Sequence, residues 1–110
     1  MAKDWKLHLL HIIDCLDKIK IICERGDLSN DFILYDASLR NLQTLAESTS
    51  HIPQEITLEY PNIDWRAING FRNILVHNYL GDIDPETVKN VITNYLPPLE
   101  IVIKKIMSNI

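Results

Sequence analysis

Residues 64–81 read DWRAINGFRNILVHNYLG, and this stretch decides how the rest of the chain is arranged. Its apolar residues recur at the spacing of an α-helix. Asp64 is placed to cap the first turn, and Gly81 supplies a residue past the end that can adopt a left-handed backbone conformation. We therefore expect one helix over residues 64–81.

This predicted helix carries polar side chains where a helix packed in a closed core would carry apolar ones. On a wheel of about 100° per residue, Arg72 and Tyr79 fall inside the apolar arc. The apolar members of that arc are Trp65, Ile68, Leu75 and Val76. Because a buried, unpaired guanidinium costs several kcal/mol, the arc is expected to meet a cleft or a partner chain. A second stripe, about 100° away, is polar throughout and consists of Arg66, Asn69, Asn73 and His77.

The bulk composition is typical of one globular domain spanning residues 1–110. The chain is 46% hydrophobic and 24% charged, with a formal net charge of −4, which argues against indiscriminate binding of nucleic acid. No apolar run approaches the roughly 20 residues of a membrane span, and Asp4 and Asp14 interrupt any signal-peptide core. We expect a cytoplasmic protein whose Cys15 and Cys23 are free, buried thiols.

The regions around the central helix also show helical periodicity, and no β-alternation of useful length occurs. Long helices are expected over residues 5–24 and 31–50, with Ser29 or Asn30 as the second N-cap. Residues 52–63 form a connector. Asp84 caps a fourth helix that Pro97-Pro98 kinks or breaks, and residues 99–107 form a last helical piece. The fold class is therefore all-α, a four-helix bundle with a proline-broken C-terminal extension.

The expected inner faces follow from the same spacing. In the first helix they are Trp5, Leu9, Ile12, Leu16, Ile19 and Cys23, widened by Leu10, Ile13, Ile21 and Ile22; in the second, Phe32, Tyr35, Leu39, Leu42, Leu45 and Ala46; in the fourth, Val88, Val91, Ile92 and Tyr95.

Arg72 and His77 form the pair that can carry chemistry. A histidine can accept or donate a proton near neutral pH, and an arginine can neutralise charge that develops on a phosphate. Without a cluster of carboxylates, this pair suits metal-independent cleavage of RNA, in which the 2′-hydroxyl is the nucleophile. DNA lacks that hydroxyl.

One chain alone does not complete such a site. Residues five apart on a helix point about 140° from each other, and acid-base cleavage needs a proton taken and a proton given. Two copies packed around a two-fold axis near the end of this helix bring both motifs together. We therefore expect a homodimer with a composite cleft.

The stretch from Arg72 to Tyr79, with Trp65-Arg66 before it, resembles the Arg-polar-x-x-x-His-x-Tyr signature of the HEPN superfamily, in particular its HepT-like toxin branch. The resemblance extends over almost the whole chain. It implies a dimeric, metal-independent ribonuclease that needs no cofactor and is the toxin of a toxin–antitoxin pair. The implied partner is a minimal nucleotidyltransferase of the MNT type.

The resemblance also implies roles for single residues. Arg72 and His77 are catalytic, Asn73 assists, and Tyr79 is the hydroxyl that the antitoxin adenylylates. AMP on Tyr79 adds bulk and negative charge where the RNA phosphate binds.

Three alternatives compete with these roles. Arg72 can form a structural ion pair with Glu47, His77 can stabilise a helix C-terminus, and Tyr79 can be an interface aromatic. The chain as a whole can be a non-catalytic HEPN-type module that binds nucleotide or docks a nucleotidyltransferase, or a plain helical interaction domain. The flank that carries Asp4, His8, His11 and Cys15 comes from a single helix, so no metal site is expected there.

Overall fold

The computed structural model describes the backbone of residues 5–77 and 84–110 and the side chains of residues 5–71 and 84–110. These residues form helices and connecting turns and no strand, which confirms the all-α prediction. The helices are α1 (Lys6–Arg25), α2 (Phe32–Thr49), α3 (Gln54–Thr57), α4 (Trp65–His77), α5 (Pro85–Asn94) and α6 (Leu96–Ser108).

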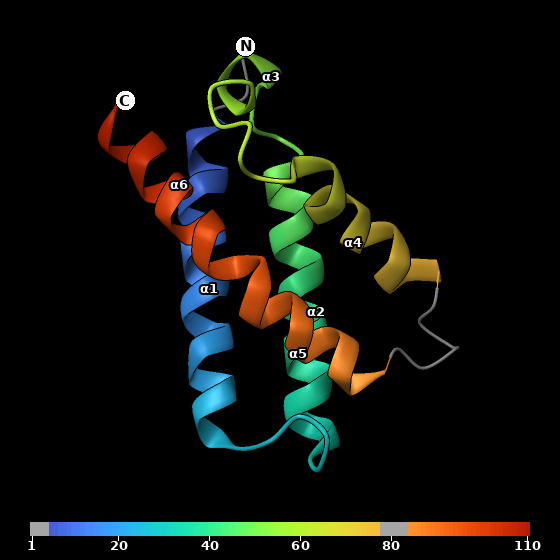
Figure 1. The fold of residues 1–110 in the computed structure, drawn as a ribbon. Helices are drawn as coiled ribbons and strands as arrows, with labels where there is room; N and C mark the ends of the chain where they lie inside the picture. The colour runs from blue at the N-terminus through green and yellow to red at the C-terminus, as the bar shows by residue number, and fades with distance from the viewer. Residues whose placement is uncertain (1–4, 78–83) are drawn as a thin grey trace.

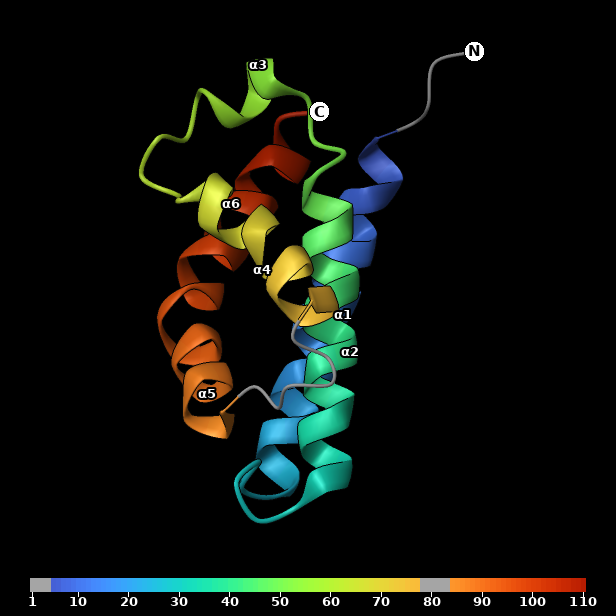
Figure 2. The same cartoon turned by 90° about the vertical axis from the view of Figure 1, so that its right-hand side faces the viewer.

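Helices α1 and α2 form an antiparallel pair. Helices α5 and α6 follow each other with a bend between them and cross this pair (Figure 1, and from the side in Figure 2). Asp31 caps α2, because its Oδ1 accepts the backbone N–H groups of Ile33 and Leu34 at 2.9 and 3.4 Å. The predicted caps, Ser29 and Asn30, are therefore wrong. Ser29 lies in the preceding turn and donates its N–H to Asp27 instead.

Helix α4 packs against α2, and Figure 1 shows that it begins beside the C-terminal end of α2 and then runs obliquely away from that helix. Within the described residues, α4 makes an extensive contact with α2 and with no other helix to a comparable extent. Its start matches the predicted helix. Residues 78–81 of that prediction, Gly81 included, lie outside the described residues.

The two prolines of the C-terminal region lie inside a helix rather than between two. The break falls at Tyr95, two residues before the predicted Pro97, and α6 begins at Leu96 with Pro97 and Pro98 in its first turn. A first turn tolerates proline because its N–H groups have no intrahelical partner. The first backbone hydrogen bond of α6 is made by the N–H of Leu99, which donates to the Tyr95 carbonyl at 3.4 Å.

The connector between α2 and α4 contains the short helix α3, which the sequence analysis missed. Pro53 starts this turn, because its carbonyl accepts the N–H groups of Ile56 and Thr57 at 2.9 and 3.1 Å. Four residues are too few to show a helical period, so the turn left no pattern to detect.

The core lies between α1, α2 and α6 and contains most of the predicted inner faces. Buried apolar residues in these helices are Leu9, Ile12, Cys15, Leu16, Ile19, Leu42, Leu45, Ala46, Leu96, Leu99, Val102, Ile103 and Ile106.

Four predicted core positions are exposed, and their place on the helices explains the error. Phe32 is 75% exposed because it stands in the first turn of α2, about 100° around the helix from the buried stripe. Leu10 and Ile21 lie on the outer flank of α1. Cys23 is exposed in the last turn of α1, whereas Cys15 is buried as predicted.

Candidate functional site

The start of α4 is held by contacts that leave its position little freedom. Asp64 Oδ1 accepts the Ala67 N–H at 3.0 Å, which confirms Asp64 as the N-cap. The indole N–H of half-buried Trp65 donates to the Tyr60 carbonyl at 3.1 Å, and Ile68 is only 1% exposed. The helix that carries the motif is therefore anchored at its N-terminal end.

Polar and aromatic contacts tie α4 to its neighbours. Thr49 Oγ1, buried at the end of α2, lies 2.8 Å from both Asn69 Oδ1 and the Ala46 carbonyl, and its single hydrogen serves one of them at a time. Phe71 packs edge-on against Tyr95, with ring centroids 5.4 Å apart. This second contact joins α4 to the bend between α5 and α6.

The predicted catalytic residues lie on the C-terminal half of this anchored helix. Arg72 and Asn73 are in its interior, and His77 is its last residue. Arg72 and His77 are five positions apart, which separates their backbone positions by about 7.5 Å along the helix axis and about 140° around it. The side chains of these three residues and the whole of Tyr79 lie outside the described residues, so their roles stay predictions.

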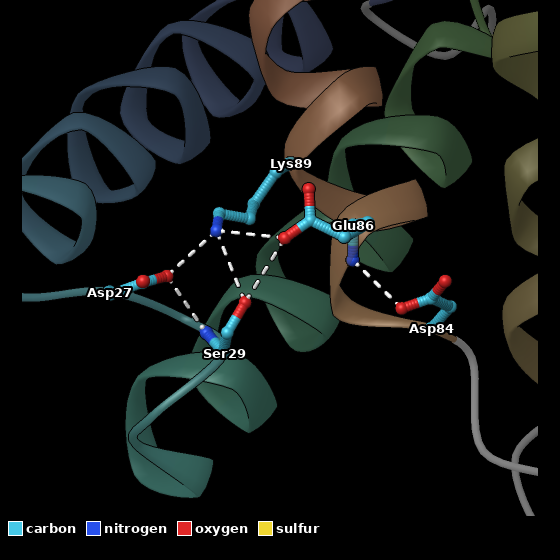
Figure 3. A network of polar contacts seen from close by, with 5 residues as sticks. All are labelled: Asp27, Ser29, Asp84, Glu86 and Lys89. Carbon is cyan, nitrogen blue, oxygen red and sulfur yellow. Dashed lines mark hydrogen bonds and ion pairs between the residues drawn. The ribbon is translucent and has the colours of Figure 1, made fainter.

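A polar network fixes the start of α5, the next described element after α4 (Figure 3). Lys89 Nζ lies 2.8 Å from Asp27 Oδ1 and donates to Ser29 Oγ and Glu86 Oε2, each at 3.1 Å. Asp84 caps the helix by accepting the Glu86 N–H at 3.1 Å, as predicted. The network joins the α1–α2 turn to α5 across a large sequence separation.

The same contacts shift two pKa values. The hydrogen bond from Lys89 lowers the pKa of Asp27, and the hydrogen bond to Asp27 raises the pKa of Lys89. Both groups lie at the surface, where solvent and salt weaken ion pairs. Stabilisation from Asp27 is therefore present above its unfolded pKa of about 3.9 and is lost as the pH falls through the lower folded value.

A stack of histidines is a feature that the sequence analysis missed. The rings of His8 and His51 lie 4.0 Å apart and are nearly parallel, with an interplanar angle of 7°. His51 Nε2 also lies 3.6 Å from Glu47 Oε2, one turn away on α2. Neither residue's local sequence signals this contact, because α1 and the end of α2 are brought together only by the fold.

Two cavities open on the surface of the described residues. One, of about 280 Å³, lies between α1 and the α5–α6 bend, with Cys23 and the Lys20–Glu100 ion pair at its edge. The other, of about 520 Å³, lies between α3 and the start of α4 and includes Trp65 and Arg66 in its lining.

Neither a metal cluster nor a membrane-spanning helix is found in the part of the chain that the structure describes. There, His, Cys, Asp and Glu side chains do not gather in groups of three that would hold a metal ion. In residues 5–77 and 84–110, no helix combines the length and apolar content that crossing a bilayer requires.

Comparison with known proteins places this geometry in context. Residues 12–106 match the protein family described as "Ribonuclease HepT-like". The chain is 28% identical to "Putative RNase MJ0127" of Methanocaldococcus jannaschii over 92 residues, which cover 78% of this chain and 75% of the relative. It is 31% identical to "Putative RNase MJ1380" of the same organism over 83 residues, covering 72% and 75%. No solved structure matches the chain.

The polar network generates a prediction about acid stability. Asp27→Asn should lower Tm by a few degrees at neutral pH, because Lys89 loses one of its carboxylate partners and keeps Glu86. The difference from the wild type should shrink as the pH falls from about 4, where Asp27 of the unfolded chain becomes protonated, through the lower pKa of Asp27 in the folded chain. Thermal melts monitored by circular dichroism at several pH values measure this.

Asp36→Asn, which changes an exposed carboxyl of α2, is the matched control and should track the wild type. A Tm difference for Asp27→Asn that stays constant down to about pH 2 would show that the network contributes through packing rather than charge.

Proposed function

We propose that this protein is a metal-independent endoribonuclease that acts on cytoplasmic RNA. The proposal starts from the family: the chain belongs to the HepT-like ribonucleases of the HEPN superfamily. The family match agrees with the resemblance predicted from the Arg72–Tyr79 motif. The observation that carries the proposal is the place of this motif: Arg72 and His77 lie five residues apart on a regular, anchored helix within the matched residues.

The cleavage step needs only two proton transfers and the stabilisation of one developing negative charge, and protein side chains can supply all three without a metal ion. A base removes the proton of the ribose 2′-hydroxyl, and the 2′-oxygen attacks the adjacent phosphorus. The bond from phosphorus to the 5′-oxygen breaks, an acid donates a proton to that oxygen, and a 2′,3′-cyclic phosphate remains. His77 supplies proton transfer, Arg72 stabilises the negative charge that develops on the phosphate, and Asn73 assists by hydrogen bonding.

The second proton-transfer group comes from a second copy of the chain. Within the described residues α4 makes its extensive contact with α2, and Phe71 adds a contact to Tyr95. The second copy packs against the rest of the C-terminal half of α4. An isologous dimer near the end of α4 places two Arg72–His77 pairs around one cleft. One histidine then acts as base and the other as acid.

We further propose that the protein is the toxin of a toxin–antitoxin pair. The antitoxin is a minimal nucleotidyltransferase that transfers AMP from ATP to the Tyr79 hydroxyl and releases pyrophosphate. Tyr79 follows His77 by two residues, so the added phosphate and adenosine occupy the space needed by the RNA phosphate. Inhibition follows from charge repulsion and steric exclusion together.

RNA cleavage in EDTA tests the enzymatic proposal. Purified wild type should cleave single-stranded RNA in the presence of the chelator. Arg72→Ala and His77→Ala should each lower the rate by about 100-fold or more, the size typical of losing a transition-state or proton-transfer group. Asn73→Ala should have a smaller effect, and gel analysis of labelled RNA measures all four proteins.

Arg25→Ala, at the far end of α1, controls for the loss of a positive charge. Equal cleavage by the wild type and by the Arg72 and His77 variants would identify a contaminating nuclease. Absence of cleavage of any RNA would instead favour a non-catalytic module that binds nucleotide or docks a nucleotidyltransferase.

Mixing subunits tests the composite cleft. After subunit exchange with about a nine-fold excess of His77→Ala, the activity per wild-type chain should fall to about one tenth, because most wild-type chains then lack a second His77. An equal excess of Arg25→Ala should not lower it. Unchanged activity with excess His77→Ala would contradict the shared site.

Mass spectrometry after co-expression with a minimal nucleotidyltransferase tests the role of Tyr79. The wild type should gain the mass of one AMP, located on Tyr79, and lose its ribonuclease activity. Tyr79→Phe should remain unmodified and active. A wild-type protein that is inhibited without any gain in mass would show that the antitoxin acts by binding alone.

A further inference from the structure

We infer that the cavity between α3 and the start of α4 binds a base of single-stranded RNA, and that the polar stripe of α4 guides the strand from this cavity toward His77. The inference rests on the ribonuclease function proposed above. It adds a binding site for substrate that lies away from the Arg72–His77 pair.

The cavity has the size and the walls of a nucleotide site. Its volume of about 520 Å³ lies in the range of about 300–1,000 Å³ typical of small-ligand sites. Leu58 lines it and is 69% exposed, so its apolar side chain is open to a ligand in the cavity. Pro61 and Trp65 add further apolar surface. Such surfaces stack against the face of any base.

Trp65 is held in place before a ligand arrives. Its indole N–H donates to the Tyr60 carbonyl at 3.1 Å, and the ring packs partly against the core. An aromatic wall that is already ordered loses little conformational entropy when a base binds against it. The cavity is thus preorganised on the side formed by α4.

The polar groups of the cavity favour a base over a phosphate. Asp64 lines it with a carboxylate, which repels phosphate and accepts hydrogen bonds from the amino groups of adenine, cytosine or guanine. One oxygen of this carboxylate, Oδ1, is already fixed by the Ala67 N–H. The exposed amide of Asn62 both donates and accepts hydrogen bonds, as the edge of a base requires.

Arg66 is suited to the phosphate that accompanies that base. It lines the same cavity, its side chain is exposed, and none of the described residues forms a hydrogen bond or ion pair with it. A guanidinium binds a phosphate through two parallel N–H groups. The base therefore enters the cavity while its phosphate remains at the rim with Arg66.

Helical register connects this cavity to the proposed catalytic residues. Arg66, Asn69, Asn73 and His77 follow one stripe of α4, and Gly70 belongs to the same side. A Cβ placed on Gly70 would meet no atom of the described residues within 4 Å, so the described surface is open at this point. Arg66 and His77 are separated by about 16 Å along the axis, a span that a few unpaired nucleotides cover.

Binding of RNA that contains 2-aminopurine tests the cavity. The protein is His77→Ala, which holds RNA without cutting it, and quenching of the 2-aminopurine fluorescence reports stacking. In this His77→Ala background, a second substitution, Arg66→Gln or Leu58→Ala, should weaken the binding of a single-stranded oligonucleotide by about 5- to 20-fold. This is the loss expected for one charge-assisted contact or one stacking surface. Adding Arg25→Gln, at the opposite end of the molecule, should leave binding unchanged.

Cleavage kinetics on the same RNA separate the two proposals. In chains with His77 intact, Arg66→Gln should raise KM with little change in kcat, and the ratio of variant to wild-type KM should increase with the length of the RNA. Active enzyme whose KM and RNA affinity do not respond to Arg66→Gln or Leu58→Ala would overturn the cavity inference alone. Inactive wild-type protein that still binds RNA through these residues would overturn the ribonuclease proposal but support the cavity.

Discussion

The packing of α4 against α2 is the contact on which the rest of the structure depends. Ile68 of α4 is buried in the core, and Asn69 contacts Thr49 at the end of α2. Phe71 adds a second contact, to Tyr95 at the bend between α5 and α6. The proposed dimer requires that the C-terminal half of α4 keep a face for a second subunit. A helix buried on all sides would hold the same Arg72 and His77 out of reach of RNA and of a second subunit.

The elements on either side of α4 fix where the motif helix begins and where the chain rejoins the bundle. Before α4, the Asp64 cap and the bond from Trp65 to the Tyr60 carbonyl set its direction. After it, Lys89 connects α5 to the α1–α2 turn (Figure 3). Each surface ion pair is individually weak, but Lys89 joins several groups at once and so specifies the position of α5.

Helical periodicity and capping residues predicted most of this fold. Leu9, Ile12, Leu16 and Ile19 repeat along α1, and Asp64 and Asp84 start the helices they were expected to start. The predictions were wrong where the same residue type is compatible with two local structures. Asp31, next to two other good caps, made the bonds that Ser29 or Asn30 had been expected to make. Pro97 and Pro98 can end a helix or begin one, and here they begin α6.

Other features depend on contacts between distant residues and leave no trace in a single sequence. The His8–His51 stack exists only because the end of α2 reaches the start of α1. The cavity beside Trp65 needs α3, a turn too short to have a period. The motif could be recognised from the sequence because Arg72, His77 and Tyr79 lie within eight residues of one another. The family match covers all three residues and supports treating them as one motif.

The central claim is that two copies of the chain bring Arg72 and His77 to one phosphodiester. An experimental structure of the wild-type protein bound to RNA methylated at its 2′-oxygens, which lacks the nucleophile and stays intact, tests it most directly. The account predicts a phosphate between the ends of two α4 helices, with guanidinium and imidazole nitrogens about 3 Å from its oxygens. A phosphate bound elsewhere, or α4 ends that face apart in every assembly, would contradict it.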